Sequence, residues 1–176
     1  MPGRGASATQ RNRLLDFDDD TDAALFTPVN DAVMGGLSWS RFERAGPGVA
    51  RFAGHVSLEN FGGFASVRTP PRYWGTAEAV AFVLRVQGDG HTYKLTVRTD
   101  DGFDGVQHQC RFDPPAGEWT EVRLPVAGFV ATFRGRPVPG ARPLDPGRVR
   151  ALGFMISDRQ AGPFELLVDW IAVERA

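Results

Sequence analysis

Period-two alternation of apolar and polar residues recurs along this chain and constrains its fold more than any other feature. Residues 80–86 place four apolar side chains on one face, and residues 93–97 place three. Such alternation predicts half-buried antiparallel strands, and the Gln-Gly-Asp-Gly turn at 87–90 predicts a hairpin between them. Further strand-like runs lie at 119–125, 150–157 and 163–173, and we expect the last two to be central strands.

Helical periodicity is weak throughout the sequence. Only residues 20–26 and 126–133 suggest a helical turn, whereas 21 glycines and 13 prolines among 176 residues indicate many turns. About ten short strands separated by turns in one domain predict an all-β fold. We expect a two-sheet antiparallel jelly-roll sandwich with little helix. Residues 134–146 contain four prolines and predict a surface loop.

The two ends of the chain differ in character. Residues 1–13 contain three arginines, no acidic residue and no amphipathic apolar face, which predicts a disordered leader. Residues 14–176 fall within the usual size of one domain, so we expect a single jelly-roll domain there.

Net charge and cysteine content restrict the classes of binding partner and the cellular compartment that we expect for this protein. A net charge of −1 argues against nucleic acid, and no apolar run approaches the length of a membrane span. Cys110 is the only cysteine, so the chain has no intrachain disulfide, which fits a reducing, cytoplasmic location. The 19 arginines against one lysine indicate GC-rich codon usage, and we expect a bacterial protein.

Catalytic and metal motifs are weak. Cys110 and His108 share a strand face and could form a nucleophile pair, but an inert, partly buried cysteine is the better interpretation. Acidic clusters at 16–22 and 100–105 resemble calcium loops only loosely, and solvated turns are favoured for both. No hydrolase elbow, zinc motif or phosphate loop is present, so we expect no enzyme, no cofactor and no metal, with a hydrolase as the least favoured alternative.

Two glycine pairs, at 35–36 and 62–63, sit in polar surroundings before strand-like runs. Asn30 and Asp31 precede the first pair and could cap a turn through hydrogen bonds to the backbone, with Ser38 starting the next strand. The alternative is a binding rim on the sandwich, built from Asp31, Asn60, Arg68 and Asp158. Arg68 and Asp158 could equally form a buried ion pair.

Aromatic residues offer a second kind of site. Trp39, Tyr73 and Trp74 are candidates for a platform on which sugar rings stack. The favoured interpretation is structural, with Trp39 in a cross-strand pair and the Tyr73-Trp74 pair closing the end of the sandwich. Trp119 and Trp170 lie in strand-like runs and are expected in the core.

Several motifs together resemble the complex I intermediate-associated protein family. They are Asn-Asp-x-Val-Met-Gly-Gly-x-Ser at 30–38, Gly-Gly-Phe-Ala-Ser-Val-Arg at 62–68, Gly-Glu-Trp at 117–119, Phe-Arg-Gly at 133–135 and Leu-Gly-Phe-Met-Ile-Ser-Asp at 152–158. The resemblance runs from about residue 14 to 174. It implies a galactose-binding-domain-like jelly roll, similar in shape to carbohydrate-binding modules.

The same resemblance implies a function. Mitochondrial members of the family act as non-enzymatic chaperones in the assembly of NADH:ubiquinone oxidoreductase. We therefore expect a monomeric binding domain that contacts respiratory-complex subunits or assembly intermediates through residues 30–38 and 60–68. The alternative is a module that binds a carbohydrate or another small ligand. The candidate binding residues are Asn30, Asp31, Ser38, Asn60, Arg68, Asp158, Trp39 and Trp74.

Overall fold

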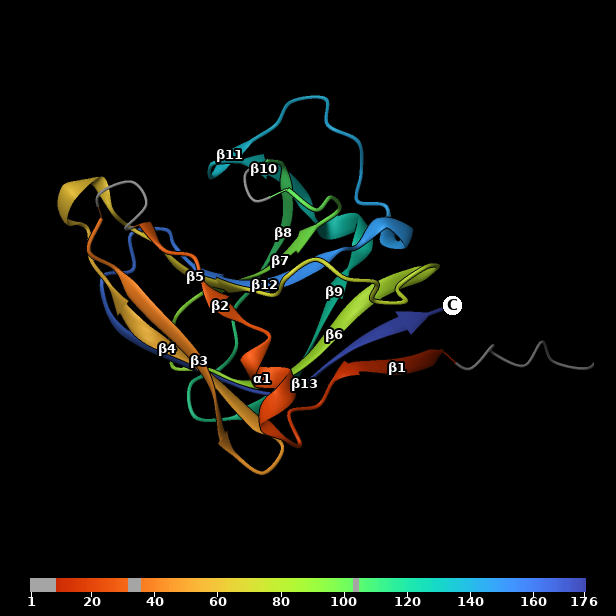
Figure 1. The fold of residues 1–176 in the computed structure, drawn as a ribbon, viewed down its shortest axis with the longest axis horizontal. Helices are drawn as coiled ribbons and strands as arrows, with labels where there is room; N and C mark the ends of the chain where they lie inside the picture. Colours follow the sequence, from red (N-terminus) through yellow and green to blue (C-terminus); the bar gives the residue numbers. More distant parts are fainter. Residues whose placement is uncertain (1–8, 32–35, 103–104) are drawn as a thin grey trace, which may run out of the picture.

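The computed structural model describes residues 9–31, 36–102 and 105–176, and these form two antiparallel sheets packed face to face (Figure 1). The six-stranded sheet has the order β3-β4-β13-β6-β9, with β1 also pairing with β13. Its strands are β1 Gln10–Leu15, β3 Trp39–Gly46, β4 Val49–Val56, β6 Ala79–Gln87, β9 Trp119–Pro125 and β13 Gly162–Arg175. The predicted all-β, two-sheet jelly roll is confirmed.

The second sheet has seven strands in the order β11-β10-β8-β7-β12-β5-β2. Its strands are β2 Thr27–Pro28, β5 Ala65–Arg68, β7 Tyr93–Arg98, β8 Gln107–Phe112, β10 Val130–Phe133, β11 Arg136–Pro137 and β12 Ala151–Ile156. Figure 1 shows this sheet curving upward from β5 and β12 toward β10 and β11, so that its outer face is concave.

The last strand, β13, organises the six-stranded sheet. Its first half pairs with β4 and its second half with β1, while β6 lies along its other edge. Gln10 is opposite Arg175 and Arg13 is opposite Ala172, so residues 10–13 belong to the sheet rather than to a leader. The backbone of these residues finds hydrogen-bond partners on β13, which composition alone did not reveal. Residues 1–8 of the predicted leader lie outside the described residues.

Alternation decides which side chains face the space between the sheets. On β6, Phe82, Leu84 and Val86 are fully buried, and on β7, Tyr93, Leu95 and Val97 are too. Val80 was predicted on the same face but is 38% exposed, and the pairing of β6 with β13 is irregular at this point, between Ala79 and Ala81. The predicted central strands at 150–157 and 163–173 correspond to β12 and β13.

An aromatic cluster joins the two sheets at the centre of the core. Phe154 on β12 contacts Phe42 on β3 with ring centroids 6.0 Å apart, and it contacts Phe52 on β4 at 6.3 Å. Phe26, which precedes β2, packs against Phe42 at 4.2 Å. Contacts of this kind add to the free energy gained by burying the rings themselves.

Helix is a minor component, as predicted. α1 spans Asp20–Ala24, and its N-cap Asp19 accepts a hydrogen bond from the backbone N–H of Thr21. The described residues also include the 3-10 turns η2 Glu59–Phe61, η3 Val126–Gly128 and η4 Pro146–Arg148. The helical turn expected at 126–133 covers only η3, since β10 follows, and the loop expected at 134–146 contains the short strand β11.

Candidate functional site

Asp31 lies at the point where the two glycine motifs meet. Its side chain is buried, and its carboxylate accepts hydrogen bonds from the backbone N–H of Ser38 at 3.0 Å and the Ser38 hydroxyl at 2.6 Å. From the second motif, the backbone N–H groups of Gly63 and Phe64 donate to the same carboxylate at 2.8 and 3.3 Å. One carboxylate therefore ties together two loops that are about thirty residues apart in sequence.

The glycines next to this carboxylate are required by close approach. A Cβ on Gly36 would lie 2.3 Å from an Asp31 carboxylate oxygen, and one on Gly62 would lie 2.7 Å from the other oxygen. Any larger residue at either position would displace Asp31. Gly35, the first member of the first pair, lies outside the described residues.

Asn30 continues the same network toward the opposite sheet. Its side-chain oxygen accepts from the Ser40 hydroxyl on β3 at 2.7 Å and from the backbone N–H of Ser66 on β5 at 3.0 Å. The Ser40 hydroxyl also reaches the Ser66 carbonyl at 3.0 Å. Because β3 and β5 belong to different sheets, these contacts fasten one open end of the sandwich. We call Asn30, Asp31, Ser38, Ser40 and Ser66 the polar clasp.

The hydrogen bonds of the clasp keep Asp31 ionised. Burial alone would raise the pKa of the Asp31 carboxyl, but the bonds from the Ser38 hydroxyl and from the backbone of Gly63, Ser38 and Phe64 outweigh it. The pKa of Asp31 therefore lies below its usual value. The favoured structural interpretation of Asn30, Asp31 and Ser38 agrees with this geometry, although the hydrogen bonds span two loops rather than one turn.

The other residues of the predicted rim lie on three different segments. Asn60 is exposed in η2 with a positive φ of 53°. Arg68 ends β5 opposite Gly153, whereas Asp158 follows the end of β12 and pairs with Lys94 at 3.2 Å. The Asp158 side chain is 46% exposed, so its observed ion pair is a surface contact with Lys94 rather than the predicted buried pair with Arg68.

The tryptophans separate into buried and exposed groups. Trp74 is buried, its indole N–H donates to the Arg150 carbonyl at 2.9 Å, and the Arg72 guanidinium lies 3.9 Å from its ring centroid. It therefore closes the sandwich and offers no free face to a sugar. Trp39 is 51% exposed on the edge strand β3. Trp170 is buried, but on the outer face of the six-stranded sheet beside Val83.

The single cysteine does not form a reactive pair. Cys110 and His108 face the same side of β8, as predicted, but the imidazole Nε2 lies 3.4 Å from the Arg142 carbonyl oxygen. Burial raises the pKa of the Cys110 thiol. A thiol that stays protonated is a poor nucleophile, and no hydrogen bond to His108 activates it within the described residues.

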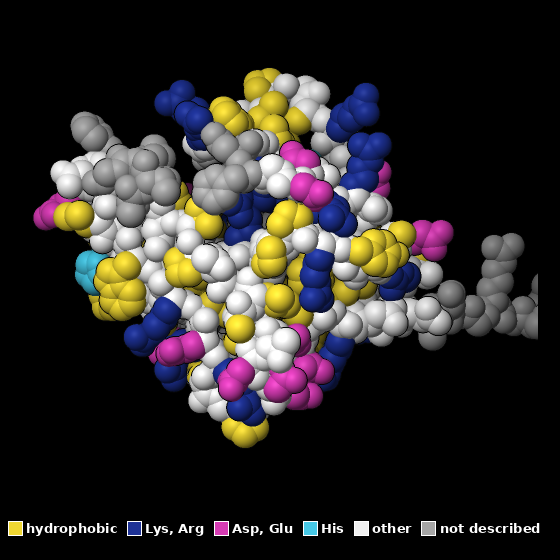
Figure 2. Space-filling view, in the orientation of Figure 1, with side chains coloured by type: hydrophobic (Ala, Val, Ile, Leu, Met, Phe, Trp, Pro, Cys, Tyr) yellow, Lys and Arg dark blue, Asp and Glu magenta, His cyan; other side chains and the backbone are white. Residues whose placement is uncertain are grey.

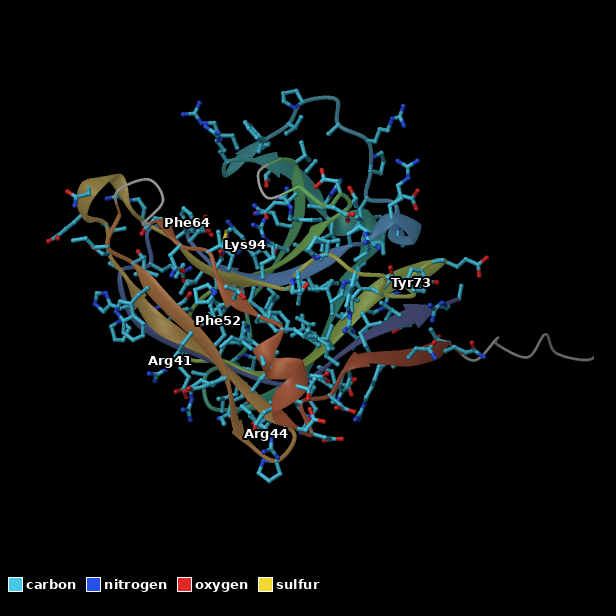
Figure 3. All side chains as sticks on the ribbon, in the orientation of Figure 1. Arg41, Arg44, Phe52, Phe64, Tyr73 and Lys94 are labelled. Carbon is cyan, nitrogen blue, oxygen red and sulfur yellow. The ribbon has the colours of Figure 1, made fainter. Side chains whose placement is uncertain are left out.

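The concave face of the seven-stranded sheet carries polar groups that the sequence did not single out. Lys94, Thr96 and Arg98 project from β7 onto this face, and Thr96 and Arg98 are each only 4% exposed. Lys94 donates to the Ser157 hydroxyl at 2.8 Å. Figure 3 places Lys94 and Phe64 above the sheet, away from Phe52 in the core. Alternation along residues 92–98 predicts this row of outward polar side chains, although it did not mark them as site residues.

Two hollows open on the described surface. A cavity of about 600 Å³ is lined by Arg98, Arg68 and largely apolar residues beside β2 and β5. A shallower one of about 350 Å³ is lined by Trp39, Arg41, Gly54, Asp89 and Glu165, among others. No group of three or more potential metal ligands occurs within residues 9–31, 36–102 and 105–176. Over the same residues, no helix has the length and apolarity needed to cross a membrane.

Comparison with known proteins identifies relatives of this chain. The family model of Complex I intermediate-associated protein 30 matches residues 15–168. The mitochondrial Complex I intermediate-associated protein 30 of Neurospora crassa is 31% identical over 137 residues, which cover 68% of this chain and 49% of that protein. The protein of the same name from Mus musculus is 33% identical over 94 residues, covering 51% of this chain and 29% of that one. The chain thus spans about half or less of these relatives.

Solved structures show the same fold with little sequence identity. The family 11 carbohydrate-binding module of the cellulosomal cellulase Lic26A-Cel5E of Clostridium thermocellum superposes with a TM-score of 0.70. It is 15% identical, and the match covers 97% of each chain. At this identity the likeness extends to the fold alone, which agrees with the galactose-binding-like jelly roll expected from the sequence.

Proposed function

This chain belongs to the Complex I intermediate-associated protein 30 family, and on that premise we propose that it is a non-enzymatic binding protein that associates with intermediates of respiratory complex I assembly. The family match over residues 15–168 carries this proposal. The fold supports it, because a rigid β sandwich presents its loops and edges as binding surfaces. The predicted partners are complex I subunits or their assembly intermediates.

We assign the protein contact to an apolar patch on the polar clasp. Leu37 and Trp39 are 54% and 51% exposed, and buried Ser38 between them bonds to Asp31. The clasp thus holds two large apolar side chains outward on the edge of a sheet. Exposed tryptophans on a rigid support are favoured centres of protein interfaces. The clasp residues position this patch, and Leu37 and Trp39 make the contact.

Affinity capture tests this assignment. We expect the tagged protein, recovered from its host after mild crosslinking, to bring down NADH dehydrogenase subunits identified by mass spectrometry. Trp39→Ala should weaken binding to a recovered subunit by roughly 30-fold, the effect of losing an interface hot spot. The melting temperature should stay unchanged, because Trp39 contributes little to the core.

Tyr73→Ala is the matched control for this experiment. Tyr73 is also an exposed aromatic, at 79%, and Figure 3 places it on the side of the molecule opposite Arg41, whose guanidinium lies 5.9 Å from the Trp39 ring centroid. Equal loss of binding in both variants would contradict the patch. Recovery of the folded wild-type protein without any complex I subunit would contradict the proposed function itself.

The cellular location of the protein is tested by cell fractionation. The relatives named above are mitochondrial proteins of a fungus and an animal, so they lend no support to the predicted bacterial and cytoplasmic assignment. Fractionation of host cells, followed by detection of the protein with and without complex I subunits, decides between a cytoplasmic pool and an organellar one.

A carbohydrate-binding role is the second candidate, and the position of Trp39 favours it. The ring of Trp39 lines the shallow cavity together with Arg41, Asp89 and Glu165, which supply charged groups beside an aromatic face. We expect a glycan array to decide this alternative. Binding that is lost in Trp39→Ala and kept in Tyr73→Ala would support it, and absence of any glycan ligand would remove it.

A further inference from the structure

The shallow cavity beside Trp39 combines an exposed aromatic ring with an excess of negative charge. It has a volume of about 350 Å³ and lies where β3 and β4 run beside the start of β13. Two carboxylates, Asp89 and Glu165, line it together with one guanidinium, that of Arg41. Figure 2 shows hydrophobic, dark-blue and magenta groups gathered over β3 and β4 at the left of the molecule. The charge of the lining therefore favours a cation over an anion.

The two carboxylates differ in their remaining capacity for hydrogen bonds. Oδ1 of Asp89 accepts from the backbone N–H of His91 at 3.1 Å and from the Tyr93 hydroxyl at 2.9 Å. Oδ2 of Asp89 accepts from the backbone N–H of Glu165 at 2.7 Å and lies 2.9 Å from Nδ1 of His91. Asp89 is thus occupied by its own chain, and it contributes negative charge to the cavity rather than a direct bond.

Glu165, by contrast, has oxygens available to a bound group. Its side chain is 53% exposed, and its carboxylate accepts no hydrogen bond from any described residue. The nearest cation is Arg51, whose Nε lies 3.2 Å from Oε2 of Glu165 without the geometry of a hydrogen bond. Arg51 also lies 3.6 Å from the Glu43 carboxylate, so it keeps an ionic partner when Glu165 turns to a ligand.

The Trp39 ring already attracts a guanidinium group. The Arg41 guanidinium lies 5.9 Å from the ring centroid, and its Nε lies 3.3 Å from the Glu43 carboxylate. Figure 3 places Arg41 on the outer side of β3 and β4, away from Phe52 in the core. Tryptophan is the ring that cations favour most, and a planar guanidinium can stack on it. Because Trp39 is 51% exposed, its ring has surface left for a second group.

The remaining lining residues suit the stem of a long cationic side chain. Ala53, Pro163 and Phe164 supply apolar surface between the charged groups. Arginine and lysine both lay their methylene stems on apolar surface while the charged end reaches a polar partner. Arginine suits this cavity better than lysine, because its planar fork donates two parallel hydrogen bonds to one carboxylate and stacks on an indole.

We propose that the shallow cavity receives an arginine side chain of the protein partner, whose guanidinium stacks on Trp39 and donates two hydrogen bonds to the Glu165 carboxylate. Asp89 attracts the same cation through its charge. The inference rests on the proposed function in one respect, since it takes the occupant from a protein partner. It also deepens that proposal: the Leu37 and Trp39 patch supplies the apolar part of the contact, and the cavity selects an arginine beside it.

Titration of the isotope-labelled protein with single-residue probes tests the cavity by nuclear magnetic resonance. The probes are the N-acetyl amides of arginine, of lysine and of citrulline, the neutral counterpart of arginine. We expect the arginine probe to shift the indole N–H of Trp39, assigned by its absence in Trp39→Phe, and the backbone amides of residues 53–54 and 164–165. The citrulline probe should bind at least roughly fivefold more weakly, because it lacks the charge.

Three variants make the test specific to this cavity. Glu165→Gln should weaken binding of the arginine probe by roughly fivefold, because it removes the charged acceptor. Glu121→Gln is the matched control, since Glu121 is 47% exposed on β9 of the same sheet and should change nothing. Arg41→Gln should strengthen binding by roughly threefold, because the resident cation no longer repels the probe.

Several results would overturn the proposal. They are equal affinity for the arginine and citrulline probes, no shift of the Trp39 indole at about 50 mM arginine probe, and unchanged binding in Glu165→Gln. Glycan binding that Glu165→Gln leaves intact, without any response to arginine, would assign the cavity to a sugar instead.

The probes also separate this inference from the proposed function. Recovery of complex I subunits together with a failed arginine titration contradicts the cavity assignment alone. A specific response to arginine without any recovered subunit supports the cavity and contradicts the proposed function.

Discussion

Asp31→Ala is expected to lower the free energy of unfolding by about 3–5 kcal/mol, a large share of the stability of a domain this size. The substitution leaves the backbone N–H groups of Ser38, Gly63 and Phe64 without their acceptor, together with the Ser38 hydroxyl. Each buried donor that loses its partner costs about 1–3 kcal/mol, less where water enters. Urea unfolding followed by tryptophan fluorescence measures the loss.

Asp20→Ala is the control for this variant. Asp20 has an 88% exposed side chain and makes only a long contact of 3.8 Å with Arg44, so we expect a change below about 0.5 kcal/mol. A second variant, Gly36→Ala, should approach the effect of Asp31→Ala, because its Cβ would overlap the carboxylate. If the unfolding free energy of Asp31→Ala equals that of the wild-type protein, the clasp does not hold the two motifs together.

The lowered pKa of Asp31 gives this prediction a pH dependence. A carboxyl whose pKa is lower in the folded state stabilises the fold above its unfolded value of about 3.9, and this stabilisation is lost as the pH falls through the folded pKa. The difference in unfolding free energy between wild type and Asp31→Asn should therefore stay constant above about pH 4 and shrink below it. A difference that grows on acidification would contradict the assignment.

Phe154→Ala is expected to be equally severe, with a loss of about 3–5 kcal/mol and a fall in melting temperature of roughly 10 °C or more. The Phe154 ring is fully buried on β12 and meets Phe42 and Phe52 of the opposite sheet. Removing it opens a cavity between the sheets that the neighbouring rings fill only in part. Thermal unfolding followed by circular dichroism measures the effect.

Two further variants test whether the loss of stability comes from the core. Phe154→Leu keeps much of the volume and should cost less than about 1.5 kcal/mol. Val130→Ala removes a side chain that is 51% exposed and should cost less than about 0.5 kcal/mol. Similar losses in all three variants would mean that the sheets are not joined through the aromatic cluster.

Much of the fold follows from local pattern. Alternation at 93–97 identified the inward face of β7, because a strand buried on one side repeats with period two whatever its neighbours are. The acidic stretch around Asp19 was identified as a turn, and it caps α1. Residues 10–13 were assigned to a leader because their partner, the end of β13, lies more than 150 residues away in the chain.

The candidate site was less predictable, because its geometry depends on distant contacts. The sequence marked Asn30, Asp31 and Ser38 as a capped turn, and it marked the second glycine pair separately. Only the fold brings the N–H groups of Gly63 and Phe64 to Asp31. Trp39 and Trp74 were both candidates for a sugar-stacking platform, yet one is half exposed and the other is buried.

By itself, the sequence determined the fold class, the family and the single-cysteine, near-neutral character of this protein. These properties depend on periodicity and motif order, which involve residues close together in the chain, and on composition, which is a sum over all residues. The tertiary structure alone decided that Asp31 closes a clasp, that Asp158 pairs with Lys94, and that Arg98 lies buried beside a cavity. Hydrogen bonding and burial depend on which strands become neighbours, and in a jelly roll those neighbours are mostly far apart in the chain.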